Sequence, residues 1–187
     1  MEKAGASPIR RRDFLVTSSL LLPGAGLSAR SGASEQPAAR TPELKGELTP
    51  AEIEIVSGSV MAKDLDNYFG KGFNCAESAL VVALRFLKKP EELAWAASGF
   101  GGGLGRKDLC GFLTAGAMAI GVYAGSLQQE RKASKDLCGR RVAELWEWWA
   151  ATAPLHCSEI REGRTDFRVC QRLGRLAAAK VEQLIRG

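Results

Sequence analysis

Helix-start signals recur through the sequence after residue 48, and no stretch there has the pattern of a strand. Residues 49–52 form a capping box with proline at the first helical position, and apolar residues follow at helical spacing to Tyr68. Asn74, with a glutamate three residues later, is a second such signature. It predicts a helix that runs to about Leu87 and stops before Pro90. These signals favour an all-α fold.

The later elements follow from the same kind of signal. Asp108 can cap a third long helix, and the fourth carries an apolar stripe of Cys138, Val142, Leu145 and Trp149. The predicted elements are a short helix over 90–98, a glycine-rich loop over 99–105, a helix over 109–123, a helix over 127–150, and a last helix capped by Thr165 or Asp166. We therefore expect an all-α bundle of about five helices, with the glycine-rich loop before the third long helix.

The first 33 residues have the form of a twin-arginine (Tat) signal peptide. The run Arg10-Arg11-Arg12-Asp13-Phe14-Leu15 gives an arginine pair, a polar residue and two large apolar residues. The apolar stretch over 14–27 is shorter than the roughly 17–25 residues of a membrane-spanning helix, so we expect no permanent membrane span. Residues 34–48 are predicted to be a flexible linker, and 49–187 the helical four-cysteine redox domain. The protein is thus expected to be exported to the periplasm, or otherwise outside the cytoplasmic membrane, with the Tat translocase as its partner during export.

The positive charge of the chain belongs largely to this leader. The formal net charge is +5, and residues 1–33 contain five basic and two acidic residues, which leaves +2 for the remainder. The rest of the chain has no basic stripe with interleaved aromatic residues, so we expect no nucleic-acid partner.

The cysteines carry the chemistry. Cys75, Cys110 and Cys170 fall at or near predicted helix starts, and Cys157 falls in a loop just before one. Unpaired N–H groups at a helix start stabilise a thiolate, which is both the redox nucleophile and the metal-ligating form. Several helix starts meeting at one point would build a soft-metal or iron–sulfur pocket. The chain has no Cys-x-x-Cys pair, so spacing alone leaves structural disulfides and buried free thiols open.

The chain resembles the family of redox-active proteins that is named after its cysteine pattern, C_GCAxxG_C_C. The matching stretches are residues 72–78, residues 100–106 leading to Cys110-Gly111, His156-Cys157 and Val169-Cys170. The resemblance implies that Cys75, Cys110, Cys157 and Cys170 are the four signature cysteines, and that Tat leaders occur among the family's members. There is one departure, because the family pattern expects alanine and glycine where this chain has Phe112 and Ala115.

Other candidates have plainer interpretations. Cys138 is predicted to be a core residue, and His156 a surface residue or a hydrogen-bond donor next to the site. The glycine-rich loop lacks a preceding strand and a following Gly-Lys-Ser/Thr, so we expect no nucleotide. No Cys-x-x-Cys-His is present, which excludes an ordinary c-type haem. Trp146, Trp148 and Trp149 cannot all face one core, so at least one should be exposed.

Our leading hypothesis is an exported redox-active protein that uses Cys75, Cys110, Cys157 and Cys170 to bind an iron–sulfur cluster or another soft metal for electron transfer. The alternatives are a thiol–disulfide redox protein that cycles the same cysteines, and a structural domain with static disulfides. Whether the protein is an enzyme, which redox partner it meets, and whether it forms a homo-oligomer are open at this stage.

Overall fold

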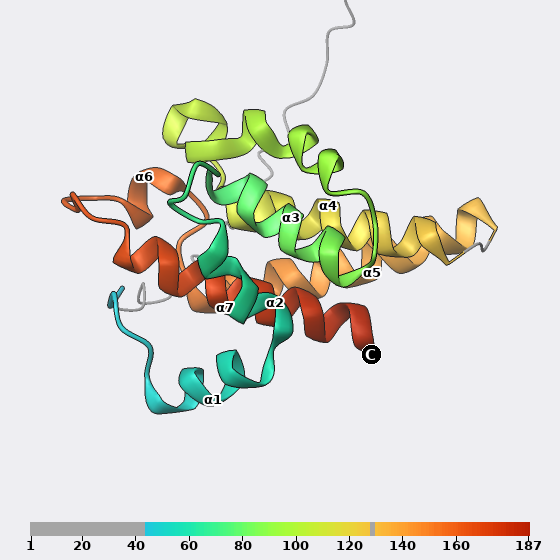
Figure 1. Ribbon diagram of the computed structural model, residues 1–187, viewed down its shortest axis with the longest axis horizontal. Helices are drawn as coiled ribbons and strands as arrows, with labels where there is room; N and C mark the ends of the chain where they lie inside the picture. The colour runs from blue at the N-terminus through green and yellow to red at the C-terminus, as the bar shows by residue number, and fades with distance from the viewer. Residues whose placement is uncertain (1–43, 128–129) are drawn as a thin grey trace, which may run out of the picture. The chain divides into compact units, whose positions relative to one another are not determined.

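The helix signals of the sequence are realised as helices that pack side by side (Figure 1). The computed structural model describes residues 44–127 and 130–187, and within these ranges it is all-α with no strand, as expected. The predicted signal peptide and residues 34–43 of the predicted linker lie outside the described residues. The elements are α1 (Pro50–Gly58), α2 (Val60–Asp64), the 3-10 turn η1 (Leu65–Asn67), α3 (Cys75–Phe86), the 3-10 helix η2 (Glu91–Phe100), the irregular turn η3 (Gly103–Lys107), α4 (Gly111–Ser126), α5 (Arg131–Thr152), the short α6 (Cys157–Ile160) and α7 (Arg168–Arg186).

Both predicted capping boxes are confirmed. The Thr49 side chain accepts a hydrogen bond from the Glu52 backbone N–H, and the Glu52 carboxylate accepts one from the Thr49 N–H at 2.8 Å. Asn74 and Glu77 make the same reciprocal pair at the start of α3. Each box satisfies backbone donors that the first turn would otherwise leave unpaired, which fixes where the helix begins.

The helix expected from residue 50 to Tyr68 is wrong in one respect, because it breaks at Ser59. Ser59 ends α1 and starts α2 in an extended conformation, with φ −98° and ψ 129°. Its hydroxyl accepts a hydrogen bond from the Ala62 N–H and donates one to the Glu182 carboxylate at 2.6 Å. The break thus depends on a partner in α7, far along the chain.

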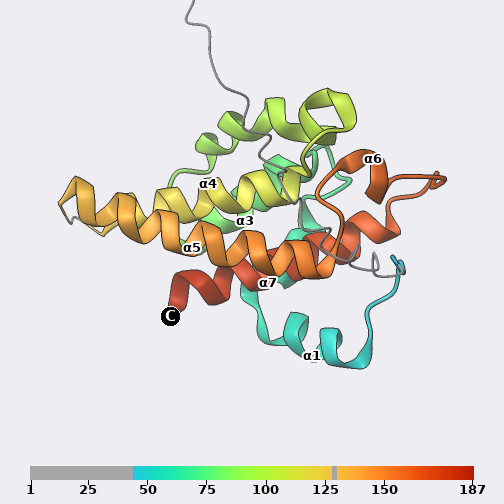
Figure 2. The same cartoon turned by 180° about the vertical axis from the view of Figure 1, so that it is seen from behind.

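Helix α4 is central among the described helices, since it contacts α3, α5 and α7. Figure 2 shows α4 and α5 side by side. An ideal Cβ on Gly116 would lie 2.9 Å from Leu145 of α5 and 3.1 Å from Val181 of α7. The small residues of α4 therefore allow close helix approach.

The bounds of α4 and α5 differ from those expected. Helix α4 begins two residues later than predicted because the Cys110 backbone N–H bonds to the Leu155 carbonyl at 2.9 Å, which keeps Cys110 outside the helix. Helix α4 also runs on to Ser126, and α5 begins at Arg131 rather than at Leu127. The predicted stripe of α5 holds, with Leu145 and Trp149 buried and Trp146 exposed.

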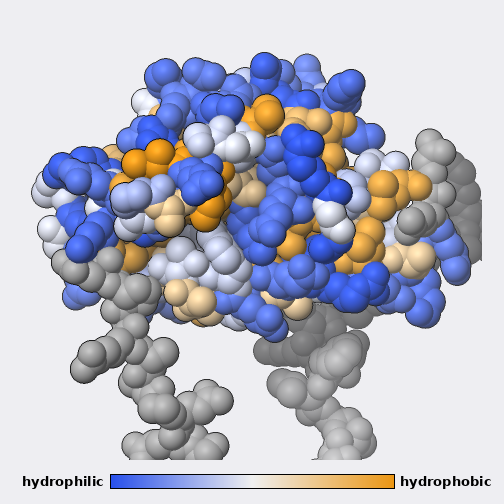
Figure 3. Space-filling model, turned by 90° about the horizontal axis from the view of Figure 1, so that it is seen from below, coloured by the Kyte–Doolittle hydropathy of each residue, from blue (hydrophilic) through white to orange (hydrophobic). Residues whose placement is uncertain are grey.

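Helix α1 packs less deeply than the others, and none of its residues is buried. Ile53 and Ile55 expose about half of their surface. Figure 3 views the molecule from the side on which α1 lies in Figure 1. On this face, hydrophobic residues form separate patches among hydrophilic ones. Among the described residues, no helix is both long enough and apolar enough to cross a membrane.

Candidate functional site

Cys75, Cys110, Cys157 and Cys170 line one cavity of about 730 Å³. All five cysteines of the chain are free thiols, and only Cys138 lies elsewhere. The other residues around the cavity are Phe69, Gly70, Phe73, Asn74, Gly102, Gly105, Lys107, Gly111, Phe112, Ile160, Arg161, Arg164, Phe167 and Gln171. The fold therefore brings together four thiols that the sequence separates. Their role as ligands or redox groups stays a prediction.

Four separate helix starts supply these thiols. Cys75 is the first residue of α3, Cys110 immediately precedes α4, and Cys170 is the third residue of α7. Cys157 was expected in a loop, but it begins the four-residue helix α6. In Figure 1 these starts gather at the end of the molecule where α6 is labelled.

A short antiparallel backbone pairing holds two of the cysteine segments together. The Cys110 N–H donates to the Leu155 carbonyl at 2.9 Å, and the Cys157 N–H donates to the Asp108 carbonyl at 2.7 Å. These bonds join segments more than forty residues apart and leave neither backbone free to shift. They bring Cys110 and Cys157 to the same cavity without a disulfide.

Gly111 explains how α3 and α4 approach each other at the site. An ideal Cβ on Gly111 would lie 2.5 Å from the Cys75 Sγ and 3.0 Å from the Phe100 carbonyl oxygen. Any larger residue would displace the Cys75 thiol, so a cysteine followed by glycine is a steric requirement of this packing.

The glycine-rich loop makes a left-handed turn beside the cysteines. Residues 102–105 all have φ between 57° and 65°, and Leu104 is the one among them that is not glycine. Left-handed backbone costs a residue with a side chain roughly 1–2 kcal/mol, so glycine is favoured at the other three positions. Gly103 lies against the Asp108 backbone, where an added Cβ would come within 2.4 Å of the carbonyl oxygen. The backbone of the loop thus lies close to the segment that leads to Cys110.

Burial dominates the acidity of the thiols. It raises the pKa of Cys110 well above the ordinary value, and the neighbouring Cys75 thiol adds to the rise, whereas hydrogen bonds with the backbone of Phe112 and Leu113 oppose it. Burial also raises the pKa of Cys157 and Cys170, and Arg161 opposes it in both cases. The sequence left the net direction open. For these three thiols, desolvation outweighs helix-start stabilisation.

Sequence reasoning missed the two arginines of the cavity. Arg161, Arg164 and Lys107 all line it. The Arg161 guanidinium donates to the backbone carbonyls of Asp166 and Thr165 and lies 4.0 Å from the centre of the Phe167 ring. Arg161 stands one helical turn after Cys157, a spacing that could have indicated it. Helix α6 is too short to be recognised from the sequence.

Two candidates lie outside the cavity. Cys138 packs between α4 and α5, where an ideal Cβ on Gly121 would be 3.9 Å from its Sγ. The His156 ring lies 3.0 Å from the Asp108 carboxylate, and both side chains are exposed. Asp108 was expected to cap the third helix, but its carboxylate faces His156 instead because Cys110 directly precedes α4.

The thiols surround the cavity without converging tightly. Among residues 44–127 and 130–187, no group of three His, Cys, Asp or Glu side chains is arranged so that it could hold one metal ion. The donors themselves are four soft sulfur atoms, which suit copper(I), zinc or iron–sulfur clusters.

The described residues form a helical domain in which four cysteines stand at four helix starts around one cavity. Residues 73–184, more than half of the chain, match the family model described as "Putative redox-active protein (C_GCAxxG_C_C)", and the chain belongs to this family. No curated protein and no solved structure matches the chain.

Proposed function

We propose that this protein is an exported redox protein whose four signature cysteines hold an iron–sulfur cluster for electron transfer. The observation that carries the proposal is the gathering of Cys75, Cys110, Cys157 and Cys170 around one cavity, although they come from four separate segments. Four thiolates are the usual protein ligand set of such clusters. The family's redox-active description supports the same conclusion.

The size of the cavity favours a cluster over a single ion. The described side chains offer no three-ligand group for one metal ion, whereas the cavity has a volume of about 730 Å³. A cluster brings its own iron and sulfide atoms and therefore spans thiolates that stand apart. Gly111 contributes by leaving the space beside the Cys75 Sγ free of a side chain.

The residues of the cavity would support a bound cluster in different ways. Such a cluster, when bound, accepts and releases an electron. Cys110, only 6% exposed, would hold its deepest side, and the phenylalanines of the cavity wall limit access of water. Arg161, in contact with Cys170, offsets the negative charge of thiolate ligands. The buried thiols lose their protons on binding, because metal coordination deprotonates a thiol.

A second candidate function is thiol–disulfide exchange, and the cation shared by Cys157 and Cys170 favours it. Burial raises the pKa of both thiols above the ordinary value, and Arg161 offsets part of this rise, which makes the attacking thiolate less unfavourable than burial alone would. The pair would form one disulfide and pass two electrons and two protons to a partner disulfide, which becomes two thiols. Static disulfides are the third candidate.

Metal and acid-labile sulfide analysis of protein purified without oxygen separates these functions. The cluster predicts stoichiometric iron and sulfide, visible charge-transfer absorption and thiols that resist alkylation until acid releases them. The exchange function predicts a colourless, metal-free protein whose cysteines titrate reversibly in pairs. Disulfides that form once and resist reduction would identify the structural domain.

Export is tested separately with the double substitution Arg11→Lys and Arg12→Lys. The translocase is expected to read the arginine pair, for which lysine is not an equivalent donor. We expect the variant to remain in the cytoplasm in cell fractionation. Normal accumulation of the processed form outside the cytoplasm would reject the Tat assignment.

A further inference from the structure

The cavity has an unbalanced charge. Lys107, Arg161 and Arg164 line it, and none of the described residues around it is Asp or Glu. Two carboxylates outside the cavity have other partners, since Asp166 pairs with Arg168 at 2.9 Å, although it also interacts with the charge of Arg161, and Asp108 faces His156. A concave site lined by one sign of charge concentrates ligands of the opposite sign.

The two guanidinium groups are held in place largely by neutral groups. Arg164 donates to the backbone carbonyls of Ile160, Glu162 and Leu44, at 3.0 to 3.3 Å. Arg161 is likewise held by carbonyls and by the face of the Phe167 ring. Neutral carbonyls orient an arginine but cancel none of its charge, and each guanidinium has five N–H donors in a planar fork that suits a carboxylate.

The same cavity offers an aromatic wall. The Phe69 ring makes edge contacts with Phe112 at 5.2 Å and with Phe167 at 6.2 Å between ring centres. Phe167 leaves 59% of its surface exposed although it lines the cavity. A volume of about 730 Å³ falls within the roughly 300–1,000 Å³ of small-molecule sites, which combine apolar walls with a few fixed polar groups.

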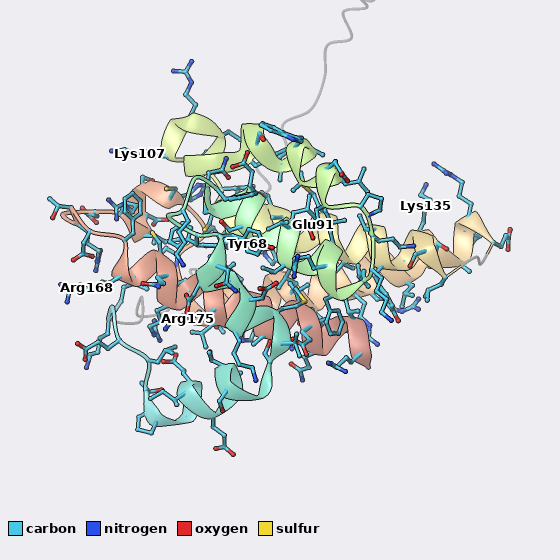
Figure 4. The ribbon with its side chains drawn as sticks, viewed as in Figure 1. Tyr68, Glu91, Lys107, Lys135, Arg168 and Arg175 are labelled. Carbon is cyan, nitrogen blue, oxygen red and sulfur yellow. The ribbon has the colours of Figure 1, made fainter. Side chains whose placement is uncertain are left out.

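We propose that this cavity binds a small organic anion, with a carboxylate held by Arg161 and Arg164 and an apolar body packed against Phe69 and Phe167. Lys107, at the exposed rim, attracts the anion electrostatically. Figure 4 shows Lys107 and Arg168 at the same end of the molecule, with Lys135 towards the other. The site shares the cavity and Arg161 with the proposed function, and it goes beyond that function because binding of the anion requires no electron transfer.

Isothermal titration calorimetry of the protein as purified tests the proposal, with benzoate as the probe. Benzamide has the same apolar body without the charge, and acetate and inorganic phosphate have the charge without the body. We expect benzoate to bind at least about tenfold more tightly than each of the three, because a charged hydrogen bond and a buried ring each contribute more than about 1.4 kcal/mol. Failure of benzoate to bind, or benzamide or phosphate binding equally well, would overturn the proposal.

Charge-removing variants test which residues hold the anion. Arg164→Gln should weaken benzoate binding on the order of tenfold, and Lys107→Gln should weaken it less because the rim is solvated. Arg168→Gln is the matched control, since this arginine is exposed and lies outside the cavity. Circular dichroism checks that Arg164→Gln folds, and Lys107→Gln keeps the test valid if it does not.

The outcomes also separate this site from the redox site. Wild-type affinity in both Lys107→Gln and Arg164→Gln would overturn the anion site, whatever the metal content. A metal-free protein that still binds benzoate and loses this binding in Arg164→Gln supports the anion site while counting against the cluster. Iron content should be the same in the control Arg168→Gln as in the wild type, because Arg168 lies outside the cavity.

Discussion

Each end of α7 carries an ionisable group, the partly buried Cys170 at the start and the buried Glu182 at the other end, and the two groups differ in their partners. At its end, the Glu182 carboxylate is 4% exposed and accepts hydrogen bonds from the Ser59 hydroxyl at 2.6 Å, the Met61 N–H at 2.8 Å and Arg186 at 2.9 Å. Burial alone would raise the pKa of Glu182, yet these three donors lower it below the ordinary value. The chain itself supplies every partner.

At its start, α7 carries Cys170, which lines a cavity whose cations have no carboxylate among the other lining residues. Three cations line this cavity without a carboxylate, and burial raises the pKa of three of its four thiols. A buried group that finds its partners within the chain stabilises the fold, whereas groups left without counter-charges suit something from outside. We therefore infer that Glu182 has a structural role and that the cavity at Cys170 is the functional site.

The largest expected effect belongs to the cysteines. Replacing Cys75, Cys110, Cys157 or Cys170 with serine should remove most bound iron or, in a metal-free protein, most reversible thiol titration, because each supplies one ligand or redox group. Cys138→Ser is the matched control and should remove neither, at a modest cost in stability. Iron stoichiometry is compared across the five variants. If only Cys138→Ser lost iron, the site would have been misplaced.

At the other end of α7, Glu182→Gln should act on stability alone. The amide cannot accept all three hydrogen bonds as a carboxylate does, and we expect a loss of about 2–3 kcal/mol in the free energy of unfolding. Urea denaturation measures it, with the exposed Glu54→Gln on α1 as the control. Iron content should stay unchanged. A loss of iron with no loss of stability would reverse the roles that we assign to the two ends.

The same contrast shows what the sequence could predict. Capping boxes act within three or four residues, so the starts of α1 and α3, and with them the position of Cys75, follow from Thr49 and Asn74. The apolar stripe of α5 is equally local. The positions of Cys75, Cys110 and Cys170 near helix starts were therefore predictable one by one, whereas that of Cys157 was not, because α6 has only four residues.

Contacts between distant segments were not predictable. The break at Ser59 depends on Glu182, and the meeting of Cys110 with Cys157 depends on backbone bonds between residues 108–110 and 155–157. Neither leaves a local pattern. Arg161 escaped notice for the same reason, since its place in the cavity comes from a helix of four residues that has no periodicity to recognise. The family pattern grouped the four cysteines, but only the fold added the cations.

Acid should weaken the structural end of α7. Because the pKa of Glu182 is lowered in the folded state, the stabilisation from this group is complete above its unfolded value of about 4.3 and is lost as the pH falls through the folded value. One such proton changes the unfolding free energy by up to about 1.4 kcal/mol per pH unit. The urea midpoint should fall as the pH is lowered from about 6 to about 3, a range that spans this titration. It should fall less steeply in Glu182→Gln than in the wild type. Equal slopes in both proteins would show that Glu182 is not charged in the fold.

The smallest effect should come from His156, which the sequence predicts to be a surface residue or a hydrogen-bond donor next to the site, and which the structure places outside the cavity. Its ring lies 3.0 Å from the Asp108 carboxylate, and because both side chains are exposed, water screens the pair. His156→Gln should therefore change stability by less than about 1 kcal/mol and leave iron content and benzoate binding at wild-type levels. The backbone bonds from Cys110 and Cys157 that fix this segment do not involve the ring. If His156→Gln instead lost iron, the imidazole would belong to the cysteine site. The cysteine end of α7 would then include a proton-carrying group as well as thiols and cations.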